Sequence, residues 1–136
     1  MSNTKQVKDY MTIATKLIKF RPDTDIFTAI ETLINKAISG APVVDDKGDL
    51  VGILSEKDCL KVLMDMSMHE LPAANVGQYM STKATTLKAT SSIMDAVELF
   101  RKNVFRRFPV VDGAKLVGIL SRRDILRAVK DIHERK

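Results

Sequence analysis

Apolar residues recur at helical spacing in two stretches of the chain, and each stretch predicts an amphipathic helix. The first stretch carries them at i, i+3, i+4, i+7, i+8 and i+11, as Ile26, Ala29, Ile30, Leu33, Ile34 and Ala37. The second follows the same spacing, with Ile93, Ala96, Val97, Phe100 and Val104. Asp23-Thr24 and Thr90-Ser91 precede the two stretches and supply side chains of the kind that cap helix N-termini.

Each predicted helix is followed by two apolar runs that are separated by turn-forming residues. The turns fall at residues 45–49 and 112–115, and this pattern is typical of a β-hairpin. A second helix is expected to start at Ser55 and at Ser121. A short extended segment is expected before each first helix, at residues 16–19 and 84–87. The order of elements in both halves is therefore strand, helix, strand, strand, helix.

The two halves also repeat each other in sequence. The matching segments are Tyr10-Met11-Thr12 with Tyr79-Met80-Ser81, residues 41–45 with 108–112, and residues 50–58 with 116–124. A repeat of this length predicts two similar units of roughly 65 residues, which we place at 1–70 and 71–136, with the joint near Pro72. Because units of this size bury little surface alone, we expect them to pack together with equivalent clefts where they meet.

The recurring elements resemble the CBS domain, a family named after cystathionine β-synthase. The elements that carry the resemblance are Tyr-Met-Thr/Ser, the Pro-Val-Val-Asp strand, the Leu-Val-Gly-Ile-Leu strand and Ser-x-x-Asp, and together they run from about Tyr10 to Val129. Two such domains in tandem are similar to a Bateman module. The resemblance implies an α+β fold in which two repeats pack with pseudo-two-fold symmetry, as a stand-alone CBS pair.

The Ser-x-x-Asp motifs, Ser55 with Asp58 and Ser121 with Asp124, allow two interpretations. A serine at a helix N-cap with an acidic residue three positions later is a capping box, which needs no ligand. The same helix start, with its free N–H groups and a hydroxyl, also suits an anion. Gly52 before the first motif allows close approach of either a ligand or another part of the chain. The resemblance implies the ligand role, in which Asp binds ribose hydroxyls and Ser binds phosphate.

The resemblance also implies which residues line the first cleft. Nucleotide-binding CBS proteins often carry a basic pair where Arg106 and Arg107 precede the second hairpin. A guanidinium fork suits phosphate oxygens, although two solvated arginines at a helix end are the alternative. The first cleft is therefore expected to combine Ser55, Lys57, Asp58, Lys83, Thr85, Arg106 and Arg107.

The second cleft is expected to combine Ser121 and Asp124 with Ser39, Gly40 and Leu17. It has no arginine at the place that Arg106 takes in the first cleft. Arg122 and its neighbour Arg123 could contribute, or could point to solvent. The difference in charge predicts two affinities, with the Asp58 cleft the tighter for phosphorylated ligands.

The distribution of charge along the chain allows an alternative function. Residues 1–68 carry 9 basic and 10 acidic side chains, and residues 69–136 carry 13 and 7, so net charges of −1 and +6 give the total of +5. A basic second half is compatible with nucleic acid, with a polyanionic ligand or with a solvated surface. The absence of Trp and the presence of only two Tyr argue against platforms for base stacking.

Several classes of protein are disfavoured by what the sequence lacks. It has no apolar run long enough to cross a bilayer and no signal-peptide core, so a cytoplasmic protein is expected. Cys59 is the single cysteine, and His69 and His133 lack partners at metal-ligand spacing, so no metal site is expected. No catalytic motif is present, so we do not expect an enzyme.

The sequence therefore favours a regulatory module that senses an adenosine-containing ligand (AMP, ADP, ATP or S-adenosylmethionine) and requires no cofactor. Such a ligand would alter the packing of a homodimer formed through the amphipathic helices and would signal to an effector protein that the sequence does not identify. The alternative is a protein-interaction or nucleic-acid-binding module whose clefts are empty.

Overall fold

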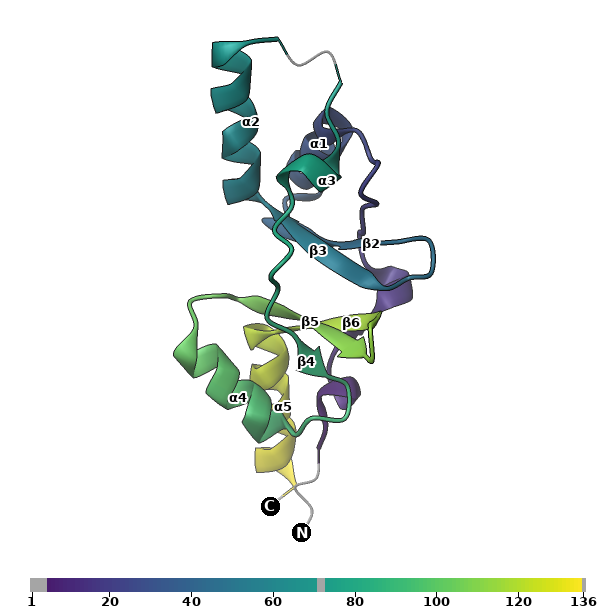
Figure 1. The fold of residues 1–136 in the computed structure, drawn as a ribbon. Helices are drawn as coiled ribbons and strands as arrows, with labels where there is room; N and C mark the ends of the chain where they lie inside the picture. The colour runs from purple at the N-terminus through teal and green to yellow at the C-terminus, as the bar shows by residue number, and fades with distance from the viewer. Residues whose placement is uncertain (1–4, 71–72, 136) are drawn as a thin grey trace. The chain divides into compact units, whose positions relative to one another are not determined.

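The computed structural model describes residues 5–70 and 73–135, and its fold is α+β. The chain divides into two compact units. The continuous unit spans Ile18–Ala84, and the discontinuous unit joins the chain up to Leu17 with the chain from Thr85 on. Figure 1 labels helices α1 to α5 and strands β2 to β6 of these units.

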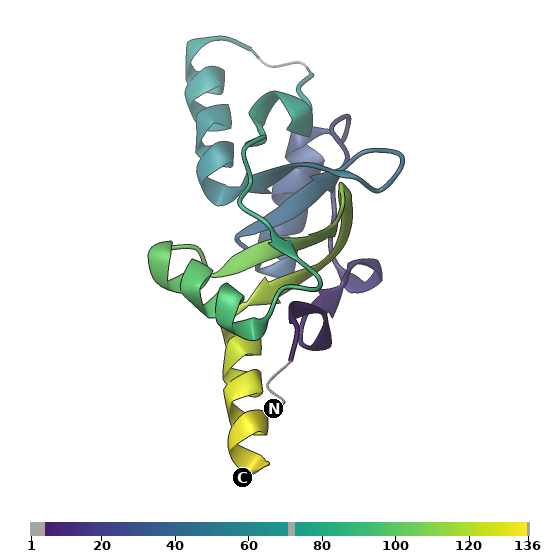
Figure 2. The same ribbon diagram turned by 60° about the horizontal axis from the view of Figure 1, so that its bottom comes forward.

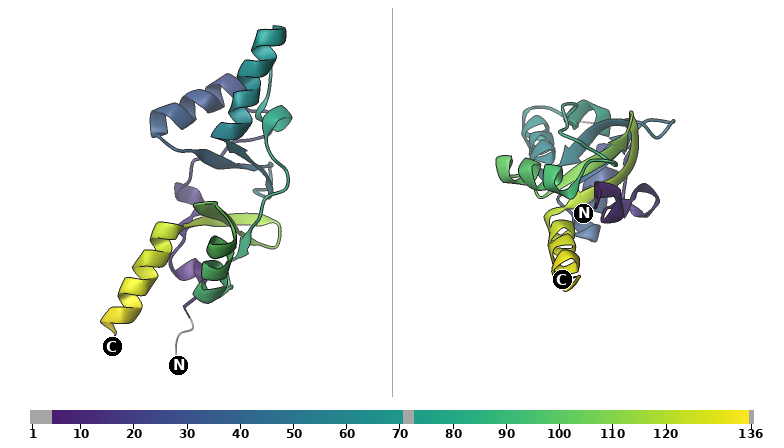
Figure 3. Two further views of the ribbon diagram at one scale, coloured as in Figure 1. Left: turned by 90° about the vertical axis from the view of Figure 1, so that its left-hand side faces the viewer. Right: turned by 90° about the horizontal axis from the view of Figure 1, so that it is seen from below.

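The continuous unit is a β-hairpin covered by helices. Its elements are α1 (Ile26–Lys36), β2 (Gly40–Val44), β3 (Leu50–Ser55), α2 (Glu56–Met68) and α3 (Val76–Tyr79). Strands β2 and β3 pair antiparallel, and the three helices lie on one face of this hairpin (Figures 1 and 3). The core between them consists of buried apolar side chains that include Ile26, Leu33, Val43, Leu54, Val62 and Val76.

The discontinuous unit has a four-stranded sheet in the order β1-β6-β5-β4. Its elements are η1 (Val7–Asp9), β1 (Thr12–Ile13), η2 (Ala14–Lys16), β4 (Leu87–Lys88), α4 (Ile93–Lys102), β5 (Arg107–Asp112), β6 (Lys115–Ser121) and α5 (Arg122–Glu134). Phe108 is buried in its core and packs against the ring of Phe100, with centroids 4.7 Å apart. Helix α5 follows β6 without a loop, as Figure 2 shows in yellow.

Each unit contains the opening segment of the other repeat, where the opening segments are residues 10–12 and 79–81. In the discontinuous unit, Thr12 pairs with Ile119 of β6. In the continuous unit, Ser81 pairs with Ile53 of β3 through hydrogen bonds of 2.9 Å in both directions. The opening segments are therefore part of the packing around the start of the second helix in each unit.

Most of the predicted elements are confirmed, including both amphipathic helices, both hairpins and the second helices after Ser55 and Ser121. The predicted caps of the first helices are wrong by one or two residues. Asp25 caps α1 by accepting from the N–H of Thr28, and Ser92 caps α4 by accepting from the N–H of Asp95. An N-cap residue directly precedes the first helical residue, and its side chain accepts from an N–H two or three residues later, so Asp25 and Ser92 are correctly placed for this role.

The extended segment predicted at residues 16–19 is wrong at Lys16 and forms no strand, although Leu17 has an extended backbone. Lys16 ends the short helix η2, and the parallel pairing of this region is a single bridge between Phe20 and Val43. The pairing stops there because Pro22, which lacks an N–H, follows within a turn. In the second repeat, β4 pairs parallel with β5 but overlaps the predicted segment 84–87 only at Leu87.

Two predictions about organisation stay predictions. The predicted boundary between residues 70 and 71 follows the sequence repeat, whereas the two compact units are defined by contacts, so the units do not test the boundary. Pro72 lies outside the described residues. The pseudo-two-fold arrangement of the repeats is likewise an expectation from the resemblance. No helix within the described ranges has the length and apolar character needed to cross a membrane.

Candidate functional site

The start of α2 forms the capping box that the sequence predicts. The Asp58 N–H donates to Ser55 Oγ at 3.2 Å, and the Ser55 N–H donates to Asp58 Oδ2 at 2.9 Å. The Ser55 hydroxyl also donates to Asp58 Oδ2, at 3.0 Å. These bonds fix the orientation of the Asp58 carboxylate against the end of β3.

The carboxylate of Asp58 has a further partner that the sequence analysis missed. Its Oδ1 accepts a 3.0 Å hydrogen bond from the hydroxyl of Ser81, in the opening segment of the other repeat. Asp58 is only 5% exposed, and a buried carboxylate needs such donors to offset the loss of water. The Tyr-Met-Thr/Ser repeat was the signal for Ser81, but spacing alone did not indicate what its hydroxyl contacts.

The two glycines before the motifs make room for the opening segments. A Cβ on Gly52 would lie 2.8 Å from both the Met80 sulfur and the Ser81 carbonyl oxygen. A Cβ on Gly118 would lie 2.6 Å from the corresponding atoms of Met11 and Thr12. Of the two roles that the sequence left open for Gly52, close approach of the chain is the one observed.

The start of α5 repeats the capping box with a different partner for the aspartate. The Ser121 N–H donates to Asp124 Oδ2 at 2.7 Å, and the Asp124 N–H donates to Ser121 Oγ at 3.2 Å. Asp124 is 4% exposed, and its Oδ1 pairs with the Arg127 guanidinium. This pair was not predicted from the sequence, although spacing of three residues on a helix is typical of an ion pair.

Within each unit, the residues that precede the hairpin lie beside the Ser-x-x-Asp motif. Arg107 pairs with Ser121 in the β5–β6 ladder, and the Arg106 carbonyl accepts from the Arg122 N–H at 3.0 Å. Gly40 pairs with Ser55 in the β2–β3 ladder, and the Ser39 carbonyl accepts from the Glu56 N–H at 2.9 Å. Each helix start is thus framed by the beginning of the adjacent strand.

The remaining predicted site residues are less constrained by their surroundings. Lys57 is exposed in the first turn of α2, and Lys83 and Thr85 are exposed in the segment between α3 and β4. Leu17 is half-buried and is the C-cap of η2. The predicted cleft sets draw on both units, Asp58 with Arg106 and Asp124 with Ser39, and these combinations stay predictions.

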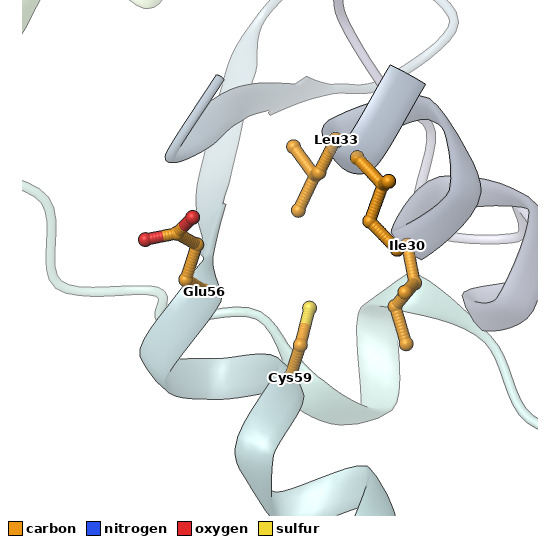
Figure 4. Close-up of a pocket in the computed structure, with 5 residues that line it drawn as sticks. Ile30, Leu33, Glu56 and Cys59 are labelled. Atoms are coloured by element: carbon orange, nitrogen blue, oxygen red, sulfur yellow. The ribbon is translucent and has the colours of Figure 1, made fainter. Parts of the chain in front are cut away.

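A separate shallow pocket of about 130 Å³ lies between α1 and α2. Its lining is mainly apolar and consists of Ile30, Leu33, Ile34, Glu56 and Cys59 (Figure 4). Sites for small molecules typically enclose roughly 300–1,000 Å³, so this pocket does not suit a nucleotide. Burial, followed by the nearby carboxylates of Asp58 and Glu56, raises the pKa of the Cys59 thiol, which therefore stays protonated near neutral pH.

Across residues 5–70 and 73–135, no group of three or more His, Cys, Asp or Glu side chains is arranged to hold a metal ion. What the two helix starts offer is a fixed, buried carboxylate beside a serine hydroxyl. Such a group can accept hydrogen bonds from a hydroxyl-bearing ligand.

The chain is similar to proteins of known family and structure. A family model of the CBS domain matches residues 7–65 and 76–131. The chloroplastic CBS domain-containing protein CBSX2 of Arabidopsis thaliana is 30% identical over 152 residues, which cover 93% of this chain and 64% of that protein. The chain therefore spans just under two thirds of the length of this relative.

Two crystal structures extend the similarity to the fold. CBSX2 in complex with AMP is 32% identical, has a TM-score of 0.82, and the match covers 95% of this chain and 98% of that chain. The CBS domain pair of protein MJ0100, in complex with 5′-methylthioadenosine and S-adenosyl-L-methionine, is 26% identical with a TM-score of 0.73, over 94% of this chain and 98% of that chain. With both repeats matched in sequence and fold, the chain belongs to the CBS domain family and carries two CBS domains in tandem.

Proposed function

We propose that this chain is a regulatory module that binds an adenosine-containing ligand, namely AMP, ADP, ATP or S-adenosylmethionine. The observation that carries the proposal is the buried Asp58 carboxylate, held by Ser55 and Ser81 at the start of a long helix. The AMP complex of CBSX2 and the S-adenosylmethionine complex of the MJ0100 pair support the choice of ligand class.

In this proposal the Asp58 carboxylate binds the ribose diol. Each carboxylate oxygen offers about two acceptor positions. Oδ2 accepts two hydrogen bonds from Ser55, whereas Oδ1 accepts one from the Ser81 hydroxyl. Oδ1 therefore retains an acceptor position for a ribose hydroxyl, and the Ser81 hydroxyl can rotate to accept from the ligand in turn.

The phosphate of a nucleotide would bind to cationic groups and to the helix start. Lys57 in the first turn of α2 is exposed and adds positive charge where the helix dipole already favours anions. Arg106 and Arg107 are proposed to complete the phosphate site from the other repeat. A guanidinium can donate two parallel hydrogen bonds to phosphate oxygens, which a lysine cannot.

We propose that the output of binding is a change in the packing of a homodimer. Exposed apolar side chains cluster on α1 and α2, namely Ile34, Leu60, Leu63 and Met64, with exposed fractions of 65–70%. Apolar surface of this kind marks an interaction site. A ligand shifts such a dimer only if its two packings bind the ligand with different affinities.

An effector protein would detect that shift, and the chain itself would regulate without catalysing a reaction. A cytoplasmic location remains our expectation.

A second candidate is suggested by the basic side of α5. Arg122, Arg123, Arg127 and Lys130 are exposed along this helix. If they bind duplex DNA, the affinity should fall with salt at a log–log slope of about −0.9 per phosphate contacted. Weak binding of duplex DNA that AMP does not displace would favour this nucleic-acid-binding candidate over the ligand sensor.

Isothermal titration with a panel of adenine ligands tests the proposed function. We expect binding of at least one of AMP, ADP, ATP and S-adenosylmethionine, and weaker binding of the matching 2′-deoxynucleotide, because Asp58 then loses half of the diol. Absence of binding by all four ligands at millimolar concentration would refute the proposal.

A further inference from the structure

The two buried aspartates differ in the group that contacts Oδ1. In the continuous unit this oxygen of Asp58 accepts from the neutral hydroxyl of Ser81 at 3.0 Å. In the discontinuous unit the same oxygen of Asp124 pairs with the guanidinium of Arg127. The side chain of Arg127 is 55% exposed and that of Asp124 is 6% exposed, so the pair joins a partly exposed cation to a buried carboxylate.

Two positions of the repeat differ around the aspartates, because Thr12 takes the place of Ser81 in the opening segment and Arg127 takes the place of Lys61 in the helix. Arg127 follows Asp124 by three residues on α5, and Lys61 follows Asp58 by three residues on α2. Lys61 is exposed, and no ion pair joins it to Asp58 in the described part of the chain. The planar guanidinium matches a carboxylate better than an ammonium does, because its N–H groups are fixed in a fork.

We propose that Arg127 is a specificity-determining residue that closes the Asp124 site to a ribose diol. This inference rests on the proposed function, in which each aspartate binds the diol through Oδ1. A diol that binds Asp124 must first displace a charge-assisted hydrogen bond from a nearly buried carboxylate, whereas a diol that binds Asp58 displaces at most a neutral hydroxyl. The chain is thereby asymmetric, with one open site at Asp58 and one site occupied by its own side chain.

Exchanging the two residues tests this assignment. Arg127→Lys keeps the net charge and places in α5 the residue that α2 already has, and Lys61→Arg does the reverse. AMP binding is measured by isothermal titration for each variant, and the Asp124 site is isolated by repeating Arg127→Lys in an Asp58→Asn background. Lys130→Gln is the control, because it removes a cation from the same face of α5 without releasing Asp124.

We expect Arg127→Lys to strengthen AMP binding at the Asp124 site by about tenfold and Lys61→Arg to weaken the Asp58 site by a similar factor. Arg127→Ala, which cannot reach Asp124 at all, should strengthen that site at least as much, and Lys130→Gln should leave it unchanged. Two sites of equal affinity in the wild type, unchanged by either Arg127 variant, would overturn the role of Arg127 and leave the proposed function intact. If every protein unfolds thermally as the wild type does and none binds AMP, ADP, ATP or S-adenosylmethionine, both the role of Arg127 and the proposed function would be overturned.

Discussion

The hydroxyl of Tyr79 donates a 2.6 Å hydrogen bond to Oδ2 of Asp65 in the middle of α2. The discontinuous unit contains the equivalent pair, since Tyr10 donates to Asp131 of α5 at 2.9 Å. In both cases the tyrosine begins an opening segment and the aspartate lies two turns after the motif aspartate. The pair holds the opening segment on the helix, and in the continuous unit this places the Ser81 hydroxyl on Asp58.

The Tyr79–Asp65 pair makes the stability of the protein sensitive to alkaline pH. The hydrogen bond to Asp65, followed by partial burial, raises the pKa of Tyr79 above its ordinary value of 10.0. A raised pKa in the folded state means that the stabilisation is present below pH 10 and is lost as the pH rises through the folded pKa. In urea unfolding, the advantage of the wild type over Tyr79→Phe should therefore be present at pH 8 and shrink above pH 10. An advantage that stays constant over this range would contradict the account.

Alanine at Gly118 should destabilise the protein because its Cβ would lie 2.6 Å from the Thr12 carbonyl oxygen. Overpacking against backbone typically costs about 1–3 kcal/mol in the free energy of unfolding. Gly113→Ala is the comparison, because Gly113 has a φ of 63° and no atom within 4 Å of a Cβ, so only backbone strain applies. Thermal unfolding should show that Gly118→Ala is less stable than Gly113→Ala. Adding Met11→Ala to Gly118→Ala should restore the lost stability only in part. Full rescue would mean that the sulfur of Met11, and not the backbone, is the obstacle.

Glycine at Ala37 should stabilise the protein. Ala37 ends α1 in the left-handed region, with φ 54° and ψ 45°, where the Cβ of an L-residue is unfavourable. Ala37→Gly should raise the free energy of unfolding by up to about 1 kcal/mol. Ala29→Gly, in the interior of the same helix, should lower it by at least about 0.5–1 kcal/mol. Equal effects of the two changes would show that the conformation of Ala37 is not strained.

The apolar side of α1 and α2 should control assembly. Leu63 is 68% exposed, and a glutamate there would place an unpaired charge inside a dimer interface. Leu63→Glu should sediment as a monomer at concentrations where the wild type sediments as a dimer. Asn35→Glu adds the same charge to an exposed position of α1 and should leave the dimer intact. A wild type that is monomeric at all concentrations would refute the proposed dimer.

The sequence was sufficient for elements whose signals are local. Periodicity predicted α1 and α4, and Ser55 and Ser121 predicted the capping boxes, because each depends on residues within one helical turn. The partners of the carboxylates were not predictable in this way. Ser81 reaches Asp58 across 23 positions, and the exchange of opening segments between units depends on tertiary packing. Arg127 was within reach of local reasoning, since it lies one turn from Asp124, but the net charge of the second half does not distinguish a paired arginine from a free one.

The most direct test of the account is AMP binding to Asp58→Asn, measured by isothermal titration beside the wild type. Asparagine keeps the shape of the side chain and can still accept from Ser55, so the fold should persist, while the charged acceptor for the ribose diol is lost. We expect AMP affinity to fall by about tenfold or more, and Asp46→Asn, which changes an exposed turn residue, to bind as the wild type does. Wild-type affinity for AMP in Asp58→Asn would contradict the assignment of the ligand site to this carboxylate.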